Sequence, residues 1–227
     1  MKYIKKIILH TLLHTLGFIV IALGISNILT SKLGASPIDA FNYFLHKIVI
    51  NYIPSLTLGT IIIFTGLAVT LLAFIFNKNK NMIISAIFLF VVGIFVDMWM
   101  FLLGYIPDQI LSLMIFRIFL AVSGMLLCSF GVAVTILTGL PPSPYERLML
   151  VIHEKINNLA IAKIIVEGSF FILAISLGLL TQSLFEQVNL FTIVMTFSIG
   201  PLVLLFSNML KKKYFKGELK NESKQVY

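Results

Sequence analysis

The chain has 227 residues, of which 59% are hydrophobic and only 11% are charged. A water-soluble domain carries about 25% charged residues, so this composition excludes a soluble globular protein. The formal net charge is +8, which would suit a nucleic-acid partner, but the positions of the basic residues argue against one.

The predicted elements are six apolar runs, each long enough to form a helix of about 20 residues, the length that crosses a bilayer. Backbone groups in lipid must form hydrogen bonds within their own segment, so runs of this length are predicted to be helices. The first run has the basic start of a signal peptide, but it is too long for one and is expected to be retained. The predicted fold class is therefore an all-α membrane protein with six transmembrane helices. In chain order the runs are 8–30, 57–76, 82–104, 112–138, 160–180 and 189–210.

The basic residues fall mainly on one side of this topology. With the N-terminus in the cytoplasm, 13 of the 17 Lys and Arg residues lie inside, Lys32 and Lys47 lie outside, and Arg117 and Lys163 lie within spans. This distribution fits the positive-inside rule. We therefore expect a protein of the cell membrane with both termini in the cytoplasm. Its basic tail, 211–227, is expected to lie against anionic lipid.

The two halves of the chain resemble each other. A shift of 107 residues without a gap aligns glycines, a Ser-Pro step and acidic residues, which hydrophobic bias alone would not align. Each half has three spans, so the second half would enter the membrane upside down, as in the inverted repeats of secondary transporters. We expect a 3+3 inverted-topology repeat, with units at 1–104 and 112–210 and a linker at 105–111. The matching pairs are Gly17 with Gly124, Gly24 with Gly131, Ser36-Pro37 with Ser143-Pro144, Asp39 with Glu146, His46 with His153, Phe90 with Phe197, and Gly93 with Gly200.

A short amphipathic helix is predicted after the first span of each half. Ser36 and Ser143 are good N-caps, each is followed by a proline, and the third helical position is Asp39 or Glu146. This is a capping-box pattern. Two interpretations remain open. Either the carboxylates only cap helices that lie along the membrane surface, or the short helices dip into the protein and their positive N-termini line a polar cavity.

Four charged residues lie within the predicted spans, where a charge costs about 2.5–3.5 kcal/mol to insert. Lys163 and Glu167 are four residues apart on one helix face, so we expect them to neutralise each other. Asp97 and Arg117 are each ten residues from Pro107 in the loop between the third and fourth spans, which predicts similar depth and a salt bridge. Structural pairing is the default for both couples, and a coupling or gating role is the alternative.

Two other sets of residues are interpreted as structural. The glycine pairs of the first and fourth spans are seven residues apart and mark faces for close helix packing. His10 and His14 have a spacing compatible with a metal ion, but no third ligand is evident. Motifs for nucleophilic catalysis, for phosphate loops and for dinucleotides are missing from the sequence. We therefore predict a protein that is not an enzyme and has no metal or cofactor.

The two Ser-Pro stretches carry a resemblance to the YczE/YyaS/YitT group of bacterial multi-pass membrane proteins. This group has a Gly-x-Ser-Pro-x-Asp stretch after the first span and a Gly-Pro-Arg-Asp-like stretch, followed by Leu-Met, after the fourth. The resemblance covers nearly the whole chain, and it implies that Lys163, Glu167 and Asp97 match charged positions of the group. Tyr145-Glu146 departs from the expected Arg-Asp, so an anion-binding arginine is missing unless Arg147 replaces it. The two stretches are Gly34-Ala35-Ser36-Pro37-Ile38-Asp39 and Ser143-Pro144-Tyr145-Glu146-Arg147-Leu148-Met149.

The leading hypothesis is a transporter or permease of the bacterial cytoplasmic membrane for a small polar solute. Carboxylates would carry protons or a coupling cation, and helix N-termini would face the solute. The alternative is an accessory or scaffold protein that docks a partner and does not transport. The expected partners are the lipid bilayer and a small polar solute, and a homo-oligomer stays open. The candidate pathway residues are Ser36, Asp39, Asp97, Ser143, Glu146, Lys163 and Glu167.

Overall fold

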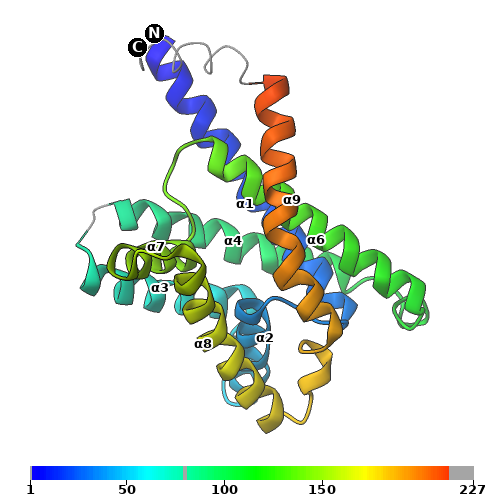
Figure 1. The fold of residues 1–227 in the computed structure, drawn as a ribbon. Helices are drawn as coiled ribbons and strands as arrows, with labels where there is room; N and C mark the ends of the chain where they lie inside the picture. Colours follow the sequence, from blue (N-terminus) through cyan, green and yellow to red (C-terminus); the bar gives the residue numbers. More distant parts are fainter. Residues whose placement is uncertain (1, 79–80, 215–227) are drawn as a thin grey trace.

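The computed structural model describes residues 2–78 and 81–214, and the regular elements in this part of the chain are all helical (Figure 1). Most of the predicted basic tail, 215–227, lies outside the described residues. Its first residues continue the last helix as far as Tyr214. The elements are α1 (Lys2–Ser31), α2 (Pro37–Val49), α3 (Leu58–Phe76), α4 (Asn81–Leu103), α5 (Asp108–Leu111), α6 (Met114–Leu137), α7 (Pro144–Ile156), α8 (Leu159–Leu180), the 3₁₀ turn η1 (Leu184–Glu186) and α9 (Leu190–Tyr214).

Six of these helices, α1, α3, α4, α6, α8 and α9, are long and apolar enough to cross a membrane. The predicted spans are therefore confirmed in number and position, and the chain is a multi-pass membrane protein. The short helix α5 lies within the predicted linker. The apolar segments are Ile7–Ser31, Leu58–Phe76, Met82–Leu103, Met114–Leu137, Leu159–Leu180 and Leu190–Lys212.

The antiparallel pair α1 and α6 forms the centre of the molecule (Figure 1). The two helices touch through their glycines: a Cβ on Gly24 would lie 2.7 Å from the carbonyl oxygen of Gly124, and one on Gly17 would lie 3.0 Å from that of Gly131. Helices in lipid approach this closely only where side chains are small. The predicted packing role of these four glycines is confirmed.

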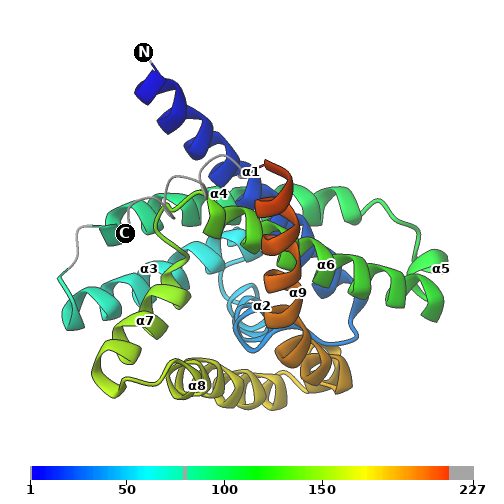
Figure 2. The same cartoon turned by 45° about the horizontal axis from the view of Figure 1, so that its top comes forward.

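The remaining helices are arranged around this pair. Helix α4 packs against α1, and α9 packs against α6. The short helices cross between the halves, because α2 packs against α8 and α7 packs against α3. Figures 1 and 2 show α2 near the middle of the molecule, next to α3 and α8.

Both short helices are inserted into the bundle. Every residue of α2 and every residue of α7 before Glu154 is buried or half-buried, and Asn42 in α2 is only 1% exposed. A helix lying on a membrane surface would keep one face open to water or headgroups. The arrangement therefore disagrees with the surface interpretation of these two helices.

The breaks before the short helices depend on backbone geometry that glycine permits. Gly34 has φ +126°, and a Cβ there would lie 2.8 Å from the hydroxyl oxygen of Thr192 at the start of α9. The chain then turns into α2 while the amide N–H of Ala35 donates to the carbonyl of Gln187 (2.9 Å). This contact fixes where α2 begins and thus the position of Ser36 and Asp39.

Candidate functional site

The acidic residues at the starts of α2 and α7 are held differently. In α7, the backbone N–H and the hydroxyl of Ser143 both donate to Glu146 Oε2 (3.1 Å each), which completes a capping box. In α2, the Ser36 hydroxyl donates to Asp39 Oδ2 (2.6 Å) and accepts from the amide N–H of Asp39 (3.2 Å). Both predicted N-caps are confirmed. Because aspartate is one methylene shorter, Asp39 is held by the Ser36 hydroxyl and not by a box.

Burial changes the acidity of both carboxyl groups. It raises the pKa of Asp39 to about 6, against the opposing effect of the Ser36 hydrogen bond. It also raises the pKa of Glu146, although the Ser143 hydrogen bonds and the Lys163 ammonium oppose it. A buried carboxylate loses hydration that its hydrogen bonds only partly replace. Asp39 therefore titrates much closer to neutral pH than an exposed aspartate.

A hydrogen-bonded chain links the two short helices through α3. The Thr65 hydroxyl of α3 lies 2.7 Å from Asn42 Oδ1 of α2 and 3.2 Å from the Tyr145 hydroxyl of α7. Asp39 is near enough to help raise the pKa of Tyr145, although burial is the larger cause. Since Tyr145 precedes Glu146, the polar starts of α2 and α7 meet in one region.

Sequence reasoning missed the members of this chain. Thr65 and Asn42 belong to no motif, and their contact joins residues 23 positions apart. Tyr145 did carry a signal, because it is the residue at which the chain departs from the pattern of the YczE/YyaS/YitT group.

The predicted pair on α8 is confirmed. Lys163 Nζ lies 3.5 Å from Glu167 Oε1, and the two side chains are 41% and 30% exposed. The Lys163 ammonium also acts on Glu146, so α7 and α8 share a charged patch. Charges that are half-open within a lipid-spanning helix need water or a polar partner.

The predicted salt bridge between Asp97 and Arg117 is wrong. Asp97 instead accepts hydrogen bonds from the Thr57 hydroxyl (2.6 Å) and the Gly59 amide N–H (2.7 Å) at the start of α3. Arg117 donates to the carbonyl oxygens of Ser31 and Lys32 (2.6 Å each) at the end of α1. Helix ends leave backbone N–H and C=O groups without partners. Each charge satisfies such groups, and similar depth did not bring the two together.

The histidines of α1 also bind a helix end. His10 Nδ1 lies 2.9 Å from the carbonyl oxygen of Thr138, and His14 Nδ1 lies 2.7 Å from the Thr138 hydroxyl. Within residues 2–78 and 81–214, no group of three or more His, Cys, Asp and Glu side chains is placed to hold a metal ion.

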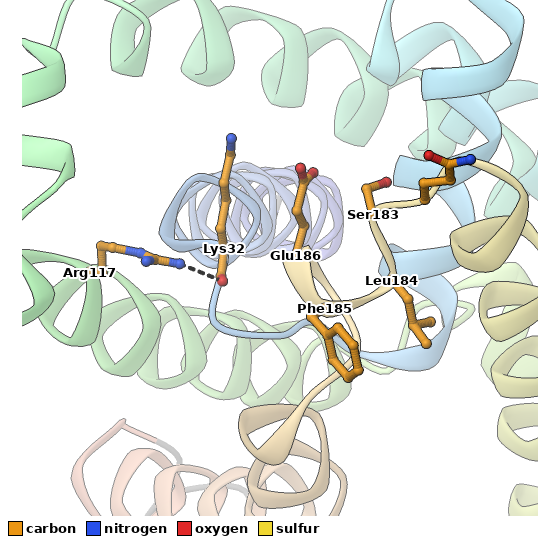
Figure 3. Close-up of a pocket in the computed structure, with 7 residues that line it drawn as sticks. Lys32, Arg117, Ser183, Leu184, Phe185 and Glu186 are labelled. Atoms are coloured by element: carbon orange, nitrogen blue, oxygen red, sulfur yellow. Dashed lines mark hydrogen bonds between the residues drawn. The ribbon is translucent and has the colours of Figure 1, made fainter.

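An open cleft of about 350 Å³ lies where α1 ends, α6 begins and the chain connects α8 to α9 (Figure 3). Its charged residues are Lys32, Arg117 and Glu186, and sequence reasoning did not single out Glu186. Glu186 is held from α2: Lys47 Nζ lies 3.1 Å from both carboxylate oxygens, and the Tyr43 hydroxyl donates to Oε2 (2.6 Å).

The surroundings of Glu186 keep it ionised. Burial alone would raise its pKa, but the hydrogen bonds of Tyr43 and Lys47 and the charges of Lys47 and Lys32 bring it below the usual value. Burial and the Glu186 carboxylate raise the pKa of Tyr43, so the phenol stays protonated and donates. The Tyr43–Glu186 hydrogen bond thus connects the cleft to α2. Tyr43 lies between Asn42 and Phe44 in the sequence.

Comparison with known proteins identifies the family of the chain. A model of a family of unknown function, DUF6198, matches residues 8–208. The chain belongs to this family. The chain is also 26% identical over 161 residues to the uncharacterized protein YyaS of Bacillus subtilis, which covers 70% of the chain and 77% of that protein. The resemblance to a YyaS-like family is therefore confirmed. No solved structure matches the chain.

The family match spans nearly the whole helical part of the chain. The matched region begins within α1 and ends within α9, so it includes both short helices and all six apolar helices. The chain is a multi-pass membrane protein of an uncharacterised family.

Proposed function

We propose that this DUF6198 protein is a secondary transporter or permease for a small polar solute, built as a 3+3 inverted-topology repeat. Its termini lie in the cytoplasm, and it has no enzymatic activity. The observation that carries the proposal is the meeting of the two inserted short helices, through Asn42, Thr65 and Tyr145, in the middle of a lipid-spanning bundle. Polar groups at that depth are costly and usually serve a solute or ion.

The α1–α6 contact supports the inverted repeat. Under the shift of 107 residues, Gly17 corresponds to Gly124 and Gly24 to Gly131. In space Gly17 meets Gly131, and Gly24 meets Gly124. A two-fold axis requires this crossed pairing, because a contact between Gly17 and Gly131 then implies a contact between their equivalents, Gly124 and Gly24.

A second reciprocal contact supports the same axis. His10 of α1 binds the carbonyl of Thr138 at the end of α6, and Arg117 of α6 binds the carbonyl of Ser31 at the end of α1. Arg117 corresponds to His10, and Thr138 corresponds to Ser31, under the same shift. The crossed packing of α2 on α8 and of α7 on α3 follows the same rule. Inverted repeats of this kind are common in secondary transporters.

The candidate residues have three roles in this proposal: exchange of the proton, lining of the route and positioning of other groups. Asp39, with a pKa of about 6, exchanges the coupled proton. Glu146 fixes the start of α7, and the Lys163–Glu167 pair lines the part of the route along α8. Ser36 and Ser143 position the two carboxyl groups. Asp97 serves the route indirectly, by fixing the start of α3, the helix that carries Thr65.

Flux measurements in proteoliposomes test the proposal. Panels of carboxylates, amino acids, sugars and inorganic ions are screened for uptake, with an entrapped pH dye to report proton movement. The double variant Asp39→Asn, Glu167→Gln is expected to lose at least about tenfold in coupled flux, because both pathway charges are gone. Asp108→Asn, an exposed acid in α5, is the matched control and should transport normally.

Two results would count against transport. One is a folded protein that moves none of the panel solutes, which would favour the accessory or scaffold alternative. The other is a double variant that transports as fast as the unmodified protein, which would remove Asp39 and Glu167 from the route.

The orientation is tested separately with single cysteines in a Cys128→Ser background. Tyr52, in the turn after α2, is 82% exposed, and Lys155, at the end of α7, is also exposed. An impermeant thiol reagent added outside cells should label Tyr52→Cys and spare Lys155→Cys. Labelling of Lys155→Cys alone would reverse the proposed topology.

A further inference from the structure

The cleft beside Arg117 has several features of a binding site. It joins the end of α1, the start of α6 and residues 182–186, and Lys32, Ser183 and Glu186 extend toward the same side of it in Figure 3. Lys32 is exposed and has φ +52°, a left-handed conformation that is uncommon for a lysine. Arg117 holds this turn by its bond to the Lys32 carbonyl (2.6 Å).

The cleft contains hydrogen-bond donors that the described residues do not use. A guanidinium has five N–H donors, and within residues 2–78 and 81–214 Arg117 uses Nε and Nη2 on the carbonyls of Ser31 and Lys32, so N–H groups are left for a ligand. An ammonium brings three more at Lys32. By contrast, Lys47 and Tyr43 already contact both oxygens of Glu186. The cleft therefore presents two cations beside a carboxylate that is already held by Lys47 and Tyr43 of α2, with a smaller electrostatic contribution from Lys32.

We propose that this cleft binds an oxyanion, a carboxylate or phosphate group, through Lys32 and the remaining donors of Arg117. The inference rests on the proposed transport function in one respect, since it assigns the solute of that function to the anionic class. The Glu186–Tyr43 hydrogen bond connects the cleft to α2, whose next residue toward the N-terminus, Asn42, belongs to the central polar chain. A cationic solute is disfavoured, because the carboxylate it would need is engaged.

Thermal unfolding of the purified full chain in detergent tests the site. Sodium phosphate, acetate and succinate are compared with sodium chloride at equal ionic strength, and at least one oxyanion should raise the Tm in a saturable way. Lys32→Gln should weaken the apparent affinity about tenfold, the usual effect of losing a charged hydrogen bond. Lys155→Gln, on the last turn of α7, is the matched control and should keep the shift.

Arg117 is left in place in this experiment because it caps α1, and its loss would affect folding as well as binding. Added phosphatidylglycerol, compared with phosphatidylcholine, separates the two sources of the anion. A Lys32-dependent shift with phosphatidylglycerol alone identifies a lipid headgroup, and one with the free salts identifies a solute. Equal shifts for chloride and every oxyanion, or shifts unchanged in Lys32→Gln, overturn the proposal.

The outcomes for the cleft and for transport are separable. Lys32-dependent binding without flux would keep the oxyanion site and remove the transport function. Flux of a neutral or cationic solute, unaffected by Lys32→Gln, would keep transport and remove the oxyanion assignment.

Discussion

Helices α3 and α4 pack closely on each other, whereas the corresponding helices α8 and α9 pack mainly on other helices. Helices α3 and α4 lie against each other, with Gly59, Gly66 and Gly93 in close contact across the interface. Helix α8 instead packs on α2 and α7, and α9 packs on α6. Gly200 of α9 corresponds to Gly93, yet a Cβ added there would meet no atom of the described residues within 4 Å.

A hydrogen-bonded anchor accounts for much of this difference. Asp97 of α4 binds the start of α3, and the residue that corresponds to it in α9 is Leu204. Apolar area does not drive helices together in lipid, so close association depends on small residues and on hydrogen bonds. The first half has both at this interface. The second half keeps Gly200, the equivalent of Gly93, but it has Leu204 in place of Asp97. It also has Pro201 within α9.

The largest effect on stability is expected from adding side-chain volume between α3 and α4. In Gly59→Ala the new Cβ would collide with the carbonyl oxygen of Gly93 and the carboxylate of Asp97. Because the first contact is with backbone, we expect a loss of about 3 kcal/mol in the free energy of unfolding. Denaturation in mixed micelles measures it. A stability equal to that of the unmodified protein would mean that α3 and α4 are not packed in this way.

Removal of the anchor should have the next largest effect. Asp97→Ala leaves the amide N–H of Gly59 and the hydroxyl of Thr57 without their acceptor, which should cost about 2 kcal/mol. The same denaturation assay measures this loss. Ile94→Ala, on the exposed face of α4, is the control for a change in that helix. Similar losses in the two variants would argue against the anchor.

The two acidic caps should differ in the same assay. Glu146→Ala removes the acceptor of the capping box of α7 and should cost about 1 kcal/mol at neutral pH. Asp39→Ala should cost less, because it removes one serine hydrogen bond where Glu146→Ala removes two. A larger loss for Asp39→Ala would reverse the comparison of the two helix starts.

The pH dependence of stability should also separate the caps. A carboxyl whose pKa is raised on folding binds its proton more tightly in the folded state, so stability falls as pH rises through the window between the two pKa values. For Asp39 this window runs from about 4, its usual value, to about 6. Thermal unfolding across this range should show a shallower slope in Asp39→Asn. An unchanged slope would mean that Asp39 is not buried.

The smallest effect on stability is expected in α8 and α9. Gly200→Ala and Gly168→Ala place a methyl group where the structure has open space, and alanine favours helix by up to about 1 kcal/mol over glycine. Stability should stay the same or rise slightly. A loss comparable to that of Gly59→Ala would show that α8 and α9 pack tightly against a neighbour in the membrane.

The sequence was most informative where the physics is local. The starts of α2 and α7 follow from a serine, a proline and an acid within four residues, and both caps formed as predicted. The pair Lys163–Glu167 also follows from helix spacing. The Asp97–Arg117 prediction failed because depth in a membrane says nothing about which neighbour a helix faces. Each of the two side chains instead binds a backbone group at the end of another helix.

Length and hydrophobicity alone therefore determined six lipid-spanning helices, because the cost of unpaired backbone in hydrocarbon leaves a long apolar run no other structure. Only the tertiary structure decided that α2 lies on α8, that α7 lies on α3, and that Thr65 joins Asn42 to Tyr145. These contacts depend on how whole helices fit together across distant parts of the chain, and no local spacing encodes them.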